Sequence, residues 1–276
     1  MAQPQTEAMI DVGRFTEQET HRLAERFRSA DPFPHVALES MLSGSPEELA
    51  GSFPDLDWPG WERFIDAYQR GKRYCGDIEA IPVPLQQVIH ELSGPTFLRF
   101  LEQVTGVTEL LPDPYLEGGG LHCTGPGGKL AVHTDFHWYP RLSLYRRVNV
   151  LLYLNPAWEP GDGGELQLFA RPNGEPVVTV APRFGTCVIF RTDDRSYHGV
   201  VPVANDSLRR SLALYYYTSR EAPDYSGDET TYWYEHEREA LGRSQRARLA
   251  AVKACFSLSR LFSMGAYHLD PNRRRG

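Results

Sequence analysis

The middle of the chain alternates short apolar or aromatic runs with turn residues, and this pattern restricts the fold more than any other feature. Between residues 110 and 218 the runs are separated by Gly, Pro, Asn and Asp. Evenly spaced short strands with turn signals between them are typical of a β-sandwich or barrel rather than a parallel α/β sheet. The predicted strands are Leu121–Cys123, Ala131–Thr134, Arg147–Leu154, Glu165–Phe169, Val177–Val180, Thr186–Arg191, His198–Val203 and Arg209–Thr218.

Helical patterns lie on both sides of this region. Residues 16–29 begin with a capping box, in which Thr16 is followed three residues later by Glu19. Leu23 and Phe27 lie four apart, as on one face of an amphipathic helix. The remaining predictions are a strand over 35–38, helices over 45–53, 84–104 (with a break at 93–95) and 234–262, and a helix or ordered loop over 60–74.

The simplest organisation is a single domain, because the sequence shows no internal repeat and no low-complexity linker. Residues 1–107 would form a mostly helical N-terminal part. Residues 108–219 would form the β core, and residues 220–276 a helical C-terminal cap.

Charge and cysteine content limit the class of protein. The net charge of −7 argues against a general nucleic-acid binder, which usually has a basic surface. The four cysteines form no C-x-x-C pair, so reduced thiols are expected. No basic segment precedes an apolar run at the N-terminus, and no apolar stretch approaches the roughly 18 residues of a membrane span. We therefore expect a cytoplasmic protein that binds neither nucleic acid nor membrane. The sequence does not indicate an oligomeric state.

The triplet His133-Thr134-Asp135 has the composition of half a metal site. In extended backbone, side chains at i and i+2 leave on the same face, so the imidazole and the carboxylate lie side by side. A histidine from another strand would complete a facial triad of two histidines and one carboxylate, the arrangement of non-haem Fe(II) oxygenases. His198, near the start of a later predicted strand, is the candidate. Taken singly, each histidine is more often a hydrogen-bonding residue than a ligand.

The strand beginning Arg209-Arg210-Ser211 has charge at its head and apolar residues after it. An arginine drawn inward with those residues needs an anion, and its planar fork suits a carboxylate. Arg209 and Ser211 share one face of the strand, whereas Arg210 points the other way. Both Arg209 and Ser211 are therefore candidates for binding one carboxylate.

Together these features resemble the 2-oxoglutarate- and Fe(II)-dependent dioxygenases, specifically their prolyl-4-hydroxylase-like branch. The resemblance spans residues 110–218 and implies a double-stranded β-helix, a jelly-roll or cupin-like barrel with flanking helices. The segments that carry it are GGGLH at 118–122, GGKL at 127–130, HTDF at 133–136, RVNVLLYLN at 147–155, GGEL at 163–166, His198, and RRSL at 209–212.

The resemblance implies roles for the singled-out residues. His133, Asp135 and His198 would bind Fe(II), with 2-oxoglutarate and O2 as co-substrates. Arg209 would pair with the distal carboxylate of 2-oxoglutarate, helped by Ser211. No catalytic side chain beyond the metal site is implied.

One position departs from the family. The usual tyrosine on the strand before H-x-D is missing, and His122, Cys123 and Thr124 stand nearby. His122 and Thr124 are therefore candidate co-substrate contacts, and Asn149 on an adjacent core strand is another. Asp135 is present, whereas related halogenases have a small residue there, so hydroxylation or another oxidation is expected.

The expected reaction is hydroxylation of an unactivated C–H bond in a small amino-acid-like or natural-product molecule, with succinate and CO2 as co-products. A small-molecule substrate is thus the expected partner. The main alternative is a hydroxylase of a protein side chain, as in prolyl hydroxylases. Less favoured are a non-oxidative metal-dependent barrel enzyme, which would not need Arg209, and a non-catalytic metal-binding sensor, which would bind metal without turnover.

Overall fold

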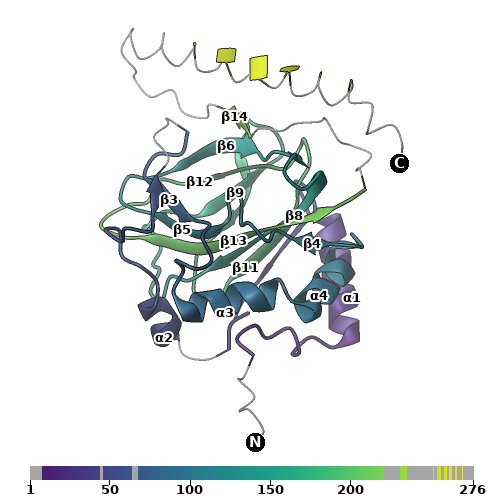
Figure 1. Cartoon of the computed structure of the whole chain (residues 1–276), viewed down its shortest axis with the longest axis horizontal. Helices are drawn as coiled ribbons and strands as arrows, with labels where there is room; N and C mark the ends of the chain where they lie inside the picture. Colours follow the sequence, from purple (N-terminus) through teal and green to yellow (C-terminus); the bar gives the residue numbers. More distant parts are fainter. Residues whose placement is uncertain are drawn as a thin grey trace, which may run out of the picture.

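Two antiparallel sheets form the body of the protein (Figure 1). The computed structural model describes residues 8–43, 46–63, 68–220 and 231–234, together with residues 251, 254–255, 258–259, 261–262, 265 and 269. The larger sheet has the strand order β1-β11-β8-β13-β5-β3-β2, with β4 on β13 and β7 on β8, and the smaller sheet has the order β10-β9-β12-β6-β14. The two sheets form the predicted double-stranded β-helix.

The larger sheet comprises β1 (His35–Leu38), β2 (Glu62–Arg63), β3 (Lys72–Cys75), β4 (Leu111–Pro112), β5 (Gly120–Thr124), β7 (Trp138–Tyr139), β8 (Leu144–Tyr153), β11 (Cys187–Arg191) and β13 (Arg209–Thr218). The smaller sheet comprises β6 (Leu130–Thr134), β9 (Leu166–Phe169), β10 (Pro176–Val180), β12 (Tyr197–Val200) and β14 (Tyr232–Tyr234). Each strand predicted in the β core and the strand over 35–38 are therefore confirmed, with ends shifted by a few residues.

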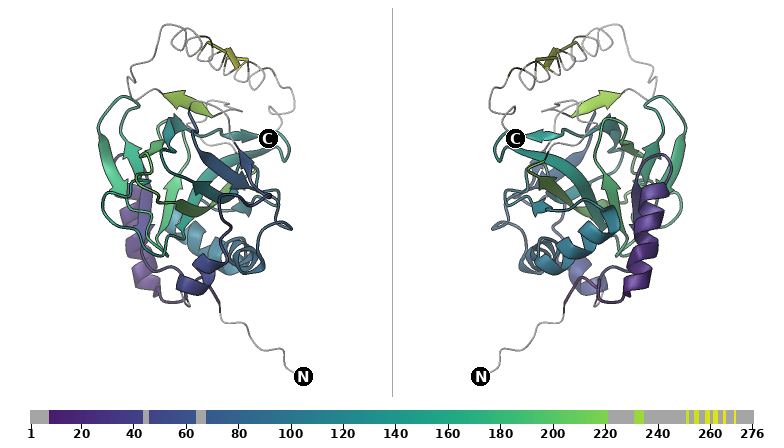
Figure 2. Two further views of the ribbon diagram at one scale, coloured as in Figure 1. Left: turned by 90° about the vertical axis from the view of Figure 1, so that its left-hand side faces the viewer. Right: turned by 90° about the vertical axis from the view of Figure 1, so that its right-hand side faces the viewer.

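The helices are α1 (Glu17–Ser29), α2 (Pro46–Gly51), α3 (Val83–Leu92) and α4 (Pro95–Thr105). The capping box at Thr16 is present, and the helical stretch breaks between α3 and α4 as predicted. The helices gather on the side of the barrel opposite β14 (Figure 1, Figure 2). None of the described helices is long and apolar enough to cross a membrane.

Strand β8 explains why helices cover one face while the other face lines the barrel. Val148, Val150 and Leu152 belong to the hydrophobic cluster that includes α3 and α4. Leu151 and Tyr153 belong to a second cluster inside the barrel. Because successive side chains alternate, a strand buried on both faces reads as a continuous apolar run.

Other parts of the fold differ from the sequence-based expectation. The prediction of a helix or loop over 60–74 is wrong where β2 and β3 extend the larger sheet. Strand β14 lies where the helix predicted over 234–262 was expected to begin. Most of the predicted cap, 220–276, lies outside the described residues, so the division into three parts of one domain stays a prediction.

Gly120 allows β3 and β5 to approach closely. Its φ is +82°, and a Cβ there would lie 2.1 Å from the Cys75 carbonyl oxygen. We predict that Gly120→Ala lowers the free energy of unfolding by about 2–4 kcal/mol, from backbone strain plus overpacking. Gly127→Ala is the control, since Gly127 has φ +68° with nothing within 4 Å. Gly127→Ala should lower the free energy of unfolding by only about 1 kcal/mol. Equal losses for the two variants in chemical denaturation would show that the close approach to the Cys75 carbonyl is unimportant.

Candidate metal centre

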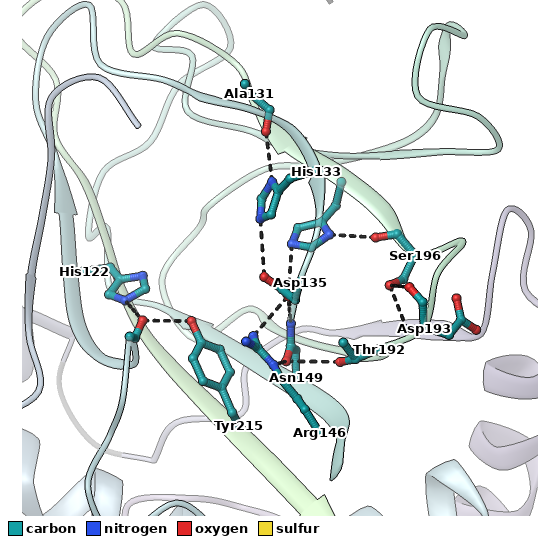
Figure 3. Close-up of polar contacts among 12 residues, drawn as sticks. His122, Ala131, His133, Asp135, Arg146, Asn149, Thr192, Asp193, Ser196 and Tyr215 are labelled. Carbon is teal, nitrogen blue, oxygen red and sulfur yellow. Dashed lines mark hydrogen bonds and ion pairs between the residues drawn. The ribbon is translucent and has the colours of Figure 1, made fainter. Parts of the chain in front are cut away.

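Strand pairing brings His133, Asp135 and His198 together at one end of the barrel. His133 in β6 lies directly opposite His198 in β12. One ligand atom from each of the three residues lies within 4.8 Å of the others, and all three side chains are buried. Nε2 of His133 is 3.5 Å from Oδ1 of Asp135 (Figure 3). Nε2 of His198 is 3.6 Å from Oδ2 of the same carboxylate.

Backbone carbonyls orient both imidazoles. Nδ1 of His133 donates to the Ala131 carbonyl at 2.9 Å, and Nδ1 of His198 donates to the Ser196 carbonyl at 2.8 Å. Each Nε2 lone pair is therefore directed into the site, as metal binding by a neutral imidazole requires. Burial, helped by the neighbouring His133, lowers the pKa of His198 to about 3. His198 is thus neutral at physiological pH.

Asp135 remains ionised despite its burial. Burial by itself raises the pKa of this carboxyl, but the Arg146 guanidinium and the two histidines outweigh it and hold the pKa well below its ordinary value. Oδ2 accepts hydrogen bonds from Nη2 of Arg146 at 3.0 Å and from Nδ2 of Asn149 at 2.6 Å. The site therefore presents two imidazole nitrogen donors and one charged oxygen donor.

This donor set fits a first-row divalent metal such as Fe(II). Imidazole and carboxylate ligands suit such ions, and three protein ligands leave coordination positions open. The triad opens into a cavity of about 430 Å³. The cavity is lined by Gln69, Lys72, Gly118, His122, Thr124, Leu130, His133, Asp135, Phe136, Arg146, Asn149, Leu151, Leu166, Phe190, His198, Val200, Arg209, Tyr215, Thr231 and Trp233.

Arg209 and its hydrogen-bond partners form a buried cationic group, the Arg209 group, in the same cavity. Its side chain is 5% exposed, and its nitrogens donate to the Gly164 carbonyl (2.9 Å), the Ser211 hydroxyl (3.2 Å) and the Tyr153 hydroxyl (3.0 Å). Arg210 points to the opposite side, over the Phe53 ring. The structure thus places Arg209 and Ser211 on one face, with a guanidinium facing the cavity where a carboxylate can bind.

His122 and Thr124 line the cavity beside this group. In the sheet register, Thr124 lies opposite Arg209, and His122 lies opposite Ser211. Nε2 of His122 donates to the Gly118 carbonyl at 2.9 Å, and burial together with the charge of Lys72 holds its pKa well below the ordinary value. His122 is therefore neutral, and its part in co-substrate binding stays a prediction.

Asn149 donates a hydrogen bond to Asp135, and its predicted contact with the co-substrate stays a prediction. Three further residues of the site were not singled out from the sequence. Arg146 contacts the triad carboxylate, and Tyr153 contacts Arg209. Trp233 in β14 stacks on the His133 ring, with centroids 4.5 Å apart. Tyr153 was accessible to sequence reasoning, because strand alternation places it on the same face of β8 as Asn149.

A double-stranded β-helix that carries a His-Asp-His triad and an arginine anion site in one cavity defines the non-haem iron oxygenase class. The family model of the 2OG-Fe(II) oxygenase superfamily matches residues 119–250. Residues 119–250, which include the triad and Arg209, therefore match a family of oxygenases that use Fe(II), 2-oxoglutarate and O2.

Proteins similar to this chain include prolyl hydroxylases and an epimerase. The chain is 38% identical over 188 residues to prolyl 3-hydroxylase OGFOD1 of Xenopus laevis, which covers 65% of this chain and 34% of the relative. The chain thus spans about a third of that relative's length. A Trichoplax adhaerens prolyl hydroxylase in complex with a hypoxia inducible factor peptide fragment has a TM-score of 0.50 and 22% identity, over 72% of this chain and 91% of that one.

The α-ketoglutarate-dependent epimerase SnoN of nogalamycin biosynthesis has a TM-score of 0.54 and 17% identity, over 74% of this chain and 82% of that one. At these identities, the two solved structures show a shared fold.

The prediction of a small-molecule partner is wrong. The relative that is 38% identical is a prolyl 3-hydroxylase, which conflicts with a small-molecule partner. The motifs in the barrel core position metal and co-substrate, so they carried no physical information about the substrate.

The buried neutral state of His198 predicts a pH-dependent stability. Below pH 6.5 the unfolded chain protonates this histidine, whereas the folded chain does not until about pH 3. Stability is therefore full above pH 6.5 and is lost as pH falls, by about 2 kcal/mol between pH 6.5 and 5. Denaturant unfolding in a chelator should show this additional loss in the wild type and not in His198→Gln. His21→Gln, on the exposed side of α1, is the control; equal slopes in wild type and His198→Gln would contradict the prediction.

Proposed function

We propose that the chain hydroxylates a protein side chain, with a prolyl residue as the first candidate. The observation that carries the proposal is that the triad and the Arg209 group open into one cavity of a chain 38% identical to a prolyl 3-hydroxylase.

His133, Asp135 and His198 are the proposed ligands of Fe(II). The bound metal, with 2-oxoglutarate and O2, supplies the oxidising chemistry that inserts one oxygen atom into a C–H bond and releases succinate and CO2. The protein provides ligands in a fixed orientation, because backbone carbonyls hold both imidazoles and two side-chain donors hold the carboxylate.

Arg209 is the proposed partner of the distal carboxylate of 2-oxoglutarate. Its guanidinium is already oriented by Gly164, Tyr153 and Ser211, so little conformational entropy is lost when the anion binds. The Tyr153 hydroxyl lies next to the guanidinium, where it can support the same carboxylate.

The rest of the cavity separates the reacting groups from water. Leu151, Leu166, Phe190 and Val200 supply apolar lining near the triad. Trp233, Phe136 and Tyr215 add aromatic surface on which an apolar ring such as the pyrrolidine of proline can pack. These walls position the target C–H bond and exclude side reactions.

The proposal predicts substrate-dependent succinate formation. Purified protein with Fe(II), 2-oxoglutarate and air should form succinate faster with proline-containing peptides than with matched alanine peptides. Mass spectrometry should locate one added oxygen on the proline. His133→Ala and Asp135→Ala should abolish both signals while the circular dichroism spectrum stays folded. Oxygen addition on a residue type other than proline would reject the prolyl assignment, and no oxygen on any peptide would reject a protein substrate.

The Arg209 assignment predicts a selective defect. Arg209→Gln removes a charge-assisted interaction worth about 1.5–3 kcal/mol, so half-saturation should need about 10–100-fold more 2-oxoglutarate. Arg210→Gln, on the opposite face of β13, is the matched control and should leave it unchanged. The dissociation constant can be measured by calorimetry without O2. If Arg210→Gln weakened 2-oxoglutarate binding more than Arg209→Gln did, the anion site would lie on the opposite face of β13 and the assignment would be wrong.

A further inference from the structure

The Arg146 guanidinium is a buried cation in direct contact with the triad. Its side chain is 2% exposed, and Nη2 donates to Oδ2 of Asp135 at 3.0 Å. The Tyr215 ring lies against it, with Cζ 3.4 Å from the ring centroid, and the Phe136 centroid lies at 4.8 Å. Burial removes bulk water from the guanidinium, and the aromatic faces partly compensate for the lost hydration of its charge. Asp135 is the anion with which Arg146 pairs.

Asn149 makes a second contact to the same carboxylate oxygen. Its Nδ2 donates to Oδ2 of Asp135 at 2.6 Å. Its Oδ1 accepts from Nε of Arg146 at 2.8 Å and from Oγ1 of Thr192 at 3.3 Å, which fixes the direction of the amide (Figure 3). Both donors bind Oδ2, whereas Oδ1 lies 3.5 Å from Nε2 of His133. The two contacts therefore hold the carboxylate from the same side.

These two contacts have opposite electrostatic consequences. Asn149 holds Asp135 with a neutral amide, so it orients the carboxylate without competing for its charge. Arg146 holds it with a full positive charge, which repels a divalent cation on the same carboxylate in a medium of low dielectric constant. In the absence of metal, the same guanidinium is the partner that a buried carboxylate needs.

We propose that Arg146 is the resident counter-cation of the triad, which stabilises the metal-free site and lowers its affinity for divalent metals, whereas Asn149 positions the carboxylate. The assignment rests on the proposed function only in taking Asp135 as a metal ligand. It requires that removing Arg146 and removing Asn149 change metal affinity in opposite directions.

The test measures Co(II) binding and thermal unfolding of the full chain, with Co(II) as an air-stable probe of the site. Arg146→Met should bind Co(II) about tenfold more tightly or better, since one repelling charge is lost. Its unfolding temperature in a chelator should fall by on the order of 10 °C, and saturating Co(II) should largely close that gap. Asn149→Ala should instead bind Co(II) about tenfold more weakly.

Matched variants separate charge from packing. Arg147→Met changes the neighbouring arginine, which donates to the Thr218 hydroxyl at 3.3 Å, and should leave Co(II) affinity unchanged. Arg146→Lys restores the charge and should recover both the affinity and most of the metal-free stability. If Arg146→Met folds only after Co(II) is added, that dependence supports the proposal. The Co(II) affinity is then measured on Arg146→Gln instead.

Equal or weaker Co(II) binding by Arg146→Met would overturn the counter-cation assignment while leaving the metal centre intact. Absence of Co(II) binding by the wild type would instead overturn the proposed metal centre, and this inference with it.

Discussion

The site depends on the pairing of β12 with β6, which places His198 directly opposite His133. The two histidines are far apart in the sequence, so only the sheet register brings them together. Because side chains alternate along a strand, a slip of one residue would turn either imidazole to the other face. The same strand β6 carries β14 on its other edge, and Trp233 lies opposite His133 there. The two pairings of β6 therefore place the candidate histidine ligands and the aromatic wall beside them.

Burial of charge is the second constraint. Asp135 is buried beside the two imidazoles in the barrel, where an unpaired carboxylate would be costly. Arg146 and Asn149 supply the compensating donors, and both come from β8, on the sheet opposite the histidines. The barrel thus brings the histidines from one sheet and the carboxylate's partners from the other. Closure of the two sheets is what assembles the centre.

Much of this arrangement follows from local sequence pattern. Alternation and turn residues predicted the core strands, and strand parity placed Arg209 and Ser211 on one face. Arg146 was missed because simple alternation from Asn149 would turn Arg147 inward. The pairing of β8 with β13 shifts register between Tyr216 and Tyr217, so that Tyr217 lies opposite Arg146. Such an irregularity re-aims a side chain and depends on the partner strand, which a single sequence does not reveal.

The elements that sequence pattern failed to predict border the cavity. Strand β3 reads Lys-Arg-Tyr-Cys and supplies Lys72, while the short β14 supplies Trp233. Neither has a long apolar run. Each pairs with a strand of the barrel core, and that pairing compensates for the weak intrinsic strand preference of its residues. The core strands, with strong local signals, supply the triad and Arg209. Motif resemblance therefore identifies the candidate metal site, whereas part of the cavity wall lies on strands that only the three-dimensional structure reveals.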